Sequence, residues 1–257
     1  MLPREIEILI LYALVGMLVL LRFDAGRFGA ADYDDEEAPG GWRTWVRRMS
    51  WYLAGIVLIF LVFRLHDLPI SELRLTIGLN FANSLVVGLI FGLLGTAVAF
   101  LYAWWRFGGL RLPPARRYPA GLVNCVGTAF LDEAVFRGII LGLTLAAGWP
   151  VELAVSFQAV LYGLVTRLGG KGRPVGMLIL ALAVGFVGGW LTINTGGIGA
   201  ALLAHALTRV GLFIGTGHAG QLRPRAPAEE ALEASDVPPP SGWAVVRDET
   251  RIYRTED

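Results

Sequence analysis

The chain contains little cysteine and little charge. Cys125 is its single cysteine, so no internal disulfide and no cysteine-rich metal site can form. Only 17% of the 257 residues are charged and 55% are hydrophobic, whereas an average soluble domain is about 25% charged. These proportions exclude a fully disordered chain, a disulfide scaffold and an ordinary soluble enzyme. The formal net charge of +1 gives no general attraction to nucleic acid, so no nucleic-acid partner is expected.

Common cofactor motifs are also missing. The sequence has no HExxH zinc motif, no P-loop and no GxGxxG pattern that follows a predicted strand. We therefore expect no bound cofactor and no metal ion.

Long hydrophobic runs are abundant. A helix needs about 20 mainly apolar residues to cross a bilayer, with a range of roughly 17–25. The sequence predicts an all-α fold, a polytopic transmembrane helical bundle with about seven spans (six to eight) and the lipid bilayer as its partner. The predicted spans are 6–21, 50–63, 81–105, 118–147, 151–165, 175–192 and 198–217. The fourth, about 45 Å long as an α-helix, is expected to break, tilt or extend beyond the hydrocarbon core.

Basic residues in the connections predict the orientation of the bundle. The segments that follow the first, third, fifth and seventh predicted spans carry 14 basic residues, beginning with Arg22. The segments on the opposite side of the membrane carry three. The positive-inside rule then places the N-terminus outside and the C-terminus in the cytoplasm, for a multi-pass protein of the cell membrane. We expect a transmembrane domain over 1–217 and a mostly disordered cytoplasmic tail over 218–257. Near the end of that tail, the segment from Trp243 alternates weakly and is a candidate strand or docking segment.

Five ionisable residues lie inside the predicted spans: Asp132, Glu133, Arg137, His205 and Arg209. Each costs about 2.5–3.5 kcal/mol at a helix centre, so such residues face the bundle interior and mark a candidate functional site. Glu133 and Arg137 are four residues apart, so we expect them to pair on one helical face. Asp132 points about 100° away from Glu133, so it is expected to face a cavity. Helical rise puts Asp132 and His205 at similar depths near the midplane.

The first charged motif has the order Asp132-Glu133-x-x-x-Arg137-Gly138. It is followed by an aromatic motif and a histidine motif in later apolar helices. This ordered set resembles the CPBP family, the CAAX-prenyl-protease and bacteriocin-processing family, over roughly residues 50–217. The family's first motif is Glu-Glu-x-x-x-Arg. The resemblance implies an intramembrane endopeptidase in which a glutamate and histidines activate water; a metal has also been proposed for the family.

The match to the family motifs is incomplete at four positions, Asp132, Tyr162, Thr166 and Arg209. Asp132 stands where the family has its first Glu, which shortens the carboxylate arm by about 1 Å, and a misplacement of that size can cost roughly 100-fold in rate. Tyr162-x-x-x-Thr166 is similar to the family's Phe-x-x-x-His, and Thr166 cannot exchange protons near neutral pH. His205-x-x-x-Arg209 is similar to its His-x-x-x-Asn or Asp, with Arg209 adding a permanent cation.

These departures leave three functional interpretations open. An active endopeptidase would cleave a prenylated peptide or a membrane protein. Asp132 or Glu133 would activate water, His205 would donate a proton, and Arg137 would orient the acids. A non-catalytic pseudoprotease would bind a membrane partner and use its two acids and two arginines, Arg137 and Arg209, as a neutral cluster that pins the fourth span to the seventh. A small transporter or channel is the third interpretation, because buried charges mark ion paths. A divalent metal is not expected, since the arginines oppose a cation.

Overall fold

The structure is a computed structural model that describes residues 4–28, 42–66, 69–113, 115, 118–169, 175–217, 243–245 and 252–254. The chain divides into two compact units, Met1–Leu222 and Arg223–Asp257. The acidic run at 32–37 and most of the predicted tail lie outside the described residues.

The described elements of the first unit are all helical, which confirms the predicted all-α, polytopic bundle. They are α1 (Arg4–Phe23), the 3-10 helix η1 (Asp24–Phe28), α2 (Trp42–Leu65), α3 (Phe81–Phe107), α4 (Tyr118–Asp132), the π-helix η4 (Glu133–Ile140), α5 (Leu141–Ala146), α6 (Val151–Leu168), α7 (Val175–Thr195) and α8 (Gly199–Thr216). Six of the helices within the described segments are long and apolar enough to cross a membrane. The protein is therefore a multi-pass membrane protein. Its orientation in the membrane stays a prediction.

The fourth predicted span, 118–147, is the continuous run of α4, η4 and α5. It carries three charged residues, Asp132, Glu133 and Arg137. The segment does not break, as one alternative expected; its hydrogen bonding widens to the π-helical pattern at the charged motif. The amide of Leu141, for example, donates to the carbonyl of Phe136, five residues earlier. Single π-helical turns inside α-helices frequently occur at functional sites.

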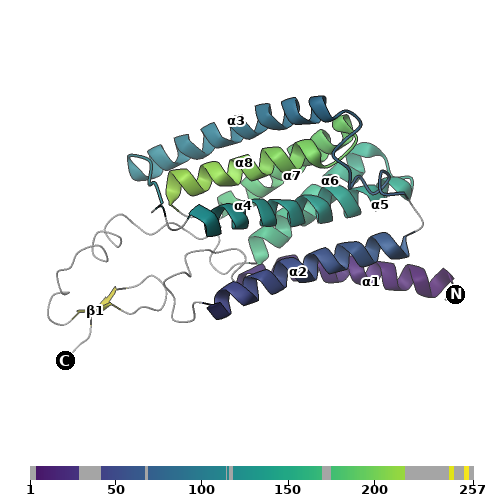
Figure 1. The fold of residues 1–257 in the computed structure, drawn as a ribbon, viewed down its shortest axis with the longest axis horizontal. Helices are drawn as coiled ribbons and strands as arrows, with labels where there is room; N and C mark the ends of the chain where they lie inside the picture. The colour runs from purple at the N-terminus through teal and green to yellow at the C-terminus, as the bar shows by residue number, and fades with distance from the viewer. Residues whose placement is uncertain are drawn as a thin grey trace. The chain divides into compact units, whose positions relative to one another are not determined.

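The α4–η4 run lies at the centre of the bundle. Helix α8 packs along α4, and α3 packs closely on α8 (Figure 1). Glycines of α3 permit this approach, because a Cβ atom at Gly92 or Gly95 would collide with side chains of α8. On other sides, α1, α2, α6 and α7 all contact η4. The charged motif is thereby surrounded by helices instead of lipid.

The second unit contains a short hairpin among its described residues. Strand β1 (Trp243–Val245) pairs antiparallel with β2 (Ile252–Arg254), and Val245 lies opposite Ile252. The segment from Trp243 therefore begins with a strand, one of the two alternatives predicted for it.

Candidate functional site

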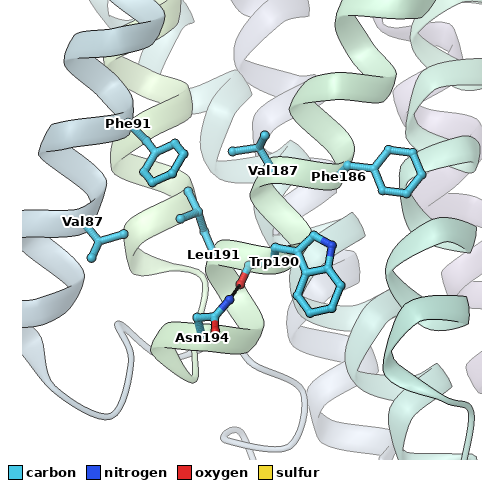
Figure 2. Close-up of a pocket in the computed structure, with 7 residues that line it drawn as sticks. All are labelled: Val87, Phe91, Phe186, Val187, Trp190, Leu191 and Asn194. Atoms are coloured by element: carbon cyan, nitrogen blue, oxygen red, sulfur yellow. Dashed lines mark hydrogen bonds between the residues drawn. The ribbon is translucent and has the colours of Figure 1, made fainter.

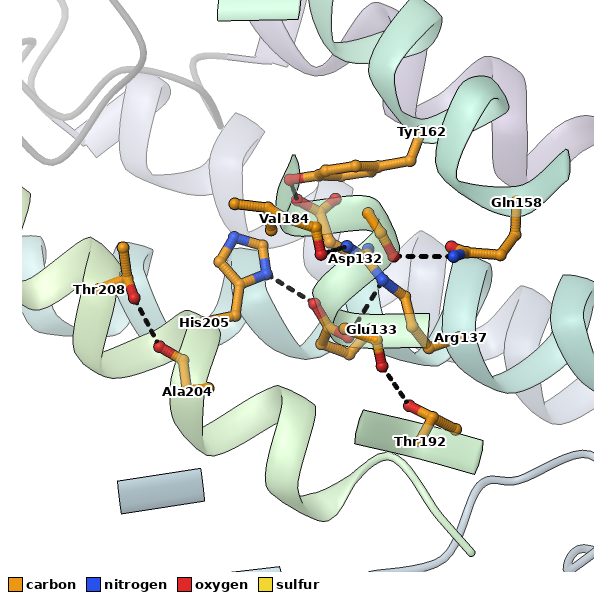
Figure 3. Close-up of polar contacts among 12 residues, drawn as sticks. Asp132, Glu133, Arg137, Gln158, Tyr162, Val184, Thr192, Ala204, His205 and Thr208 are labelled. Atoms are coloured by element: carbon orange, nitrogen blue, oxygen red, sulfur yellow. Dashed lines mark hydrogen bonds and ion pairs between the residues drawn. The ribbon is translucent and has the colours of Figure 1, made fainter. Parts of the chain in front are cut away.

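A buried cluster of charged residues forms where η4 meets α6 and α8 (Figure 3). Asp132, Glu133 and Arg137 have no exposed side-chain surface in the structure. His205, at 8%, and Arg209, at 5%, are almost as deeply buried. The four-residue spacing on α8 turns both of the latter toward the central run. Such burial is tolerated only where charges are paired, so the partners of each group define the site.

Glu133 lies between a histidine and an arginine. Its Oε1 is 2.7 Å from Nδ1 of His205, and its Oε2 is 3.4 Å from Nε of Arg137. The expected ion pair between Glu133 and Arg137 is thus present, and Figure 3 shows His205 reaching Glu133 from α8. Through its contact with His205, Glu133 connects η4, in the fourth predicted span, to α8, which is the seventh.

Asp132 has a different set of partners, led by Arg22 of α1. The Nε of Arg22 pairs with Oδ1 of Asp132, and its Nη2 donates to Oδ2 at 3.3 Å. The hydroxyl of Tyr162 also donates to Oδ2, at 3.4 Å. The expectation that Asp132 faces a cavity is therefore wrong: the side chain is fully buried and engaged by a guanidinium. Aligned charge-assisted hydrogen bonds of this kind are among the strongest in proteins.

The assignment of Arg22 to the first connection is also wrong. Arg22 belongs to α1 and is 4% exposed. It follows Leu11, Leu14 and Leu18 on the same buried face, at spacings of three or four residues. This stripe was a signal in the sequence, because an arginine in register with buried leucines points into the bundle. With Arg22 included, three arginines face two carboxylates, so the formal charge of the cluster is +1, not the expected zero.

Arg137 is held from three directions. Besides the Glu133 contact, its Nη2 donates to the carbonyl of Val184 on α7 at 3.0 Å. Its guanidinium carbon lies 4.3 Å from the ring centroid of Tyr162, a cation–π contact. Space for it exists because α7 has Gly188 at this level: a Cβ there would lie 2.9 Å from Nε of Arg137.

Arg209 and Thr166 complete the predicted positions. Nη2 of Arg209 donates to Oδ1 of Asn124 at 3.2 Å, two helical turns before Asp132 on α4. Asn124 also accepts from Thr128 at 3.2 Å. Thr166 is 1% exposed and lies one turn after Tyr162 on α6. The bond between Asn124 and Arg209 was not predicted, although Asn124, Thr128 and Asp132 follow one another in steps of four residues and form a polar edge of α4.

The donor set does not fit a metal ion. Both oxygens of Asp132 bond Arg22, and the oxygens of Glu133 contact His205 and Arg137. Within the described part of the chain, no group of three or more His, Cys, Asp or Glu residues is arranged to hold a metal. The guanidinium groups occupy the positions that a cation would need.

A separate groove lies between α3 and α7 (Figure 2). Its volume is about 430 Å³, and it is lined by Val87, Phe91, Phe186, Val187, Trp190, Leu191 and Asn194. Its lining is mainly apolar, and the Asn194 side chain donates to the carbonyl of Trp190 at 2.7 Å. None of the lining residues belongs to the charged cluster.

Comparison with known proteins gives one match. Residues 114–211 match the family model described as type II CAAX prenyl endopeptidase Rce1-like. No curated protein and no solved structure matches the chain. The matched range begins just before α4, ends within α8 and contains all three motifs, whereas α1, α2 and α3 precede it. Over residues 114–211, which are less than half of the chain, this multi-pass membrane protein is thus similar to the Rce1-like type II CAAX prenyl endopeptidases.

Proposed function

We propose that this chain is a non-catalytic CPBP-like protein of the cell membrane, a pseudoprotease that binds a membrane partner. The observation that supports this most directly is the ion pair between Arg22 and Asp132. Asp132 stands at the position of the family's first glutamate. A general base must contact the water that it deprotonates, directly or through one other water. Here both carboxylate oxygens are engaged and the side chain has no exposed surface.

Two further departures, Thr166 and Arg209, support the same conclusion. Thr166 has a hydroxyl where the family has an imidazole, so it cannot carry a proton near neutral pH. Arg209 has a permanent charge where the family has Asn or Asp, and it bonds Asn124 on α4. The polar groups therefore connect helices α1, α4, α6, α7 and α8. Removing one partner of such a buried pair is strongly destabilising, by about 3–5 kcal/mol, which is consistent with a structural role.

Retained endopeptidase activity is the second candidate, and one contact favours it. Glu133 and His205 form a carboxylate–histidine pair at 2.7 Å, the arrangement that orients an imidazole for proton transfer. His205 is also the most exposed of the five predicted ionisable residues, at 8%. In this alternative, Glu133 accepts a proton from water and His205 donates one to the leaving amine. The substrate would be a prenylated peptide or a membrane protein.

A peptidase assay separates the two candidates. The purified protein is incubated in detergent with a farnesylated CAAX peptide and with a transmembrane-protein substrate. Wild type is compared with Glu133→Gln and His205→Ala. We expect all three proteins to show only background hydrolysis. Cleavage by wild type that both substitutions abolish would establish the endopeptidase and refute the pseudoprotease.

A further inference from the structure

Helix α1 covers the face of the bundle on which Asp132 lies. Its buried side chains form one stripe, and the remainder of the helix is largely exposed. The stripe consists of Leu11, Leu14, Leu18 and Arg22. The leucines share one core cluster with residues of η4 and α6, among them Val135, Ile139, Tyr162 and Val165. Helix α1 therefore closes the side of the charged site between these two helices.

The rest of α1 is only shallowly packed. In its apolar stretch 22% of the residues are buried, the same share as in α3 and less than the 50% in α8, as expected for a helix at the edge of the bundle. Leu9 is 70% exposed and Leu20 is 64% exposed. Transmembrane helices associate without a hydrophobic driving force, so packing and polar contacts decide which helix occupies a face. Toward η4 and α6, the only charged contact of α1 within its described residues is the pair of Arg22 with Asp132. On its other side, the indole of Trp51 in α2 donates to the carbonyl of Leu21 at 2.8 Å.

The charge on this face restricts which helix can occupy it. Asp132 is fully buried, and Arg22 supplies its guanidinium partner. An occupant without a cation would leave a carboxylate unpaired in a low-dielectric environment, which is costly. An occupant with a basic residue at this depth, and leucines one, two and three turns before it, reproduces the contacts of α1. Tyr162 adds a hydroxyl at the same point.

We propose that the face formed by η4 and α6 around Asp132 is a docking site for an arginine-bearing transmembrane helix, with α1 as its exchangeable resident. The inference rests on the proposed non-catalytic function and names the class of partner: a single transmembrane helix with a basic side chain opposite Asp132. Helix α1 precedes residues 114–211, so the docking face belongs to the family-matched region while its resident does not.

The test supplies α1 as a separate peptide. A synthetic peptide of residues 1–28, with benzoylphenylalanine in place of the partly buried Val15, is added to the full-length protein in lipid nanodiscs and photolysed. Mass spectrometry then locates the crosslinks. Full-length Arg22→Gln, whose own α1 lacks the cation, is compared with wild type. Full-length Leu18→Ala, which weakens the packing of the leucine stripe, is a second protein to which the peptide can crosslink. Gly16→Ala is the matched control, because it changes α1 where no neighbouring atom lies within 4 Å of the added Cβ.

We expect the peptide to crosslink to η4 and α6. The yield should be on the order of tenfold higher in Arg22→Gln than in wild type or Gly16→Ala, and a tenfold difference in binding corresponds to about 1.4 kcal/mol. Peptides with Lys at position 22 should retain labelling, and peptides with Gln or Glu there should lose it. Equal labelling by the Arg, Gln and Glu peptides, or no labelling of either loosened acceptor, would overturn the proposal. Peptidase activity in the separate assay would refute the pseudoprotease without changing this readout.

Discussion

Arg22 and Asp132 form an ion pair inside the bundle although 110 residues separate them in the chain. The pair joins a helix that precedes the family-matched region to the first motif of that region. The carboxylate at the position of the family's first glutamate is thereby bound by a residue that the three motifs do not include.

Removal of the arginine should destabilise the fold. Arg22→Gln leaves Asp132 buried without its charged partner, and breaking a buried pair in this way costs about 3–5 kcal/mol. Thermal unfolding in detergent measures the effect. Asp132→Asn in the Arg22→Gln background should recover a large part of the loss, because no isolated charge then remains. Additive effects of the two substitutions would show that the side chains are not coupled.

A methyl group at Gly188 should disturb Arg137. The Cβ of Gly188→Ala would lie 2.9 Å from Nε of Arg137, which is held by Glu133, Val184 and Tyr162 and cannot move freely. Overpacking of this kind costs about 1–3 kcal/mol.

Gly16→Ala is the matched control for Gly188→Ala, because nothing lies within 4 Å of a Cβ at Gly16. It should leave the melting temperature unchanged or raise it, since alanine favours a helix over glycine by about 1 kcal/mol. Equal losses for both variants would contradict the packing described around Arg137.

Restoring the family residues should not be sufficient for catalysis. Asp132→Glu, Thr166→His and Arg209→Asn together recreate the family motifs, but Arg22 can still bind the carboxylate at position 132. We expect peptidase activity only when Arg22→Leu is added, because a free carboxylate must reach water. The farnesylated-peptide assay measures this, with size-exclusion profiles as the folding check. Activity of the triple variant alone would show that Arg22 does not block the site.

Cys125 should report on packing between α4 and α8. The thiol is fully buried in a cluster with Phe213 of α8. Maleimide should therefore label it slowly in the native protein, and Phe213→Ala should accelerate labelling strongly by opening a cavity beside it. As a control, Phe91→Ala on the groove wall should leave the labelling rate unchanged. Rapid labelling of wild type would contradict the burial of this residue.

Sequence analysis predicted the membrane-spanning segments because their determinant is local. A run of about 20 apolar residues suffices to indicate a span, and all seven predicted runs are helical in the structure. The pairing of Glu133 with Arg137 could also be predicted from the sequence, because it depends only on a spacing of four residues within one segment.

The partner of Asp132 was missed for a physical reason. The positive-inside rule counts every arginine near the end of a span as a surface residue. Arg22 is such a residue, yet its side chain turns along the leucine stripe into the core. Contacts between distant segments, such as Arg209 with Asn124, depend on how helices pack, and spacing within one segment does not contain that information.

The π-helical turn at Glu133–Ile140 changes which residues of this helix lie on the same face. Each π turn takes about one residue more than the 3.6 of an α-helix, so residues after it are rotated relative to an uninterrupted helical wheel. Deleting one residue between Val135 and Ile139 would let the segment close into a regular α-helix. Asp132 would keep its direction, and Leu141 and the residues after it would also face nearly the same side, because the shorter α-helical turn covers the same rotation. The same deletion in the regular part of α4 would instead turn every later residue by roughly 100° about the axis.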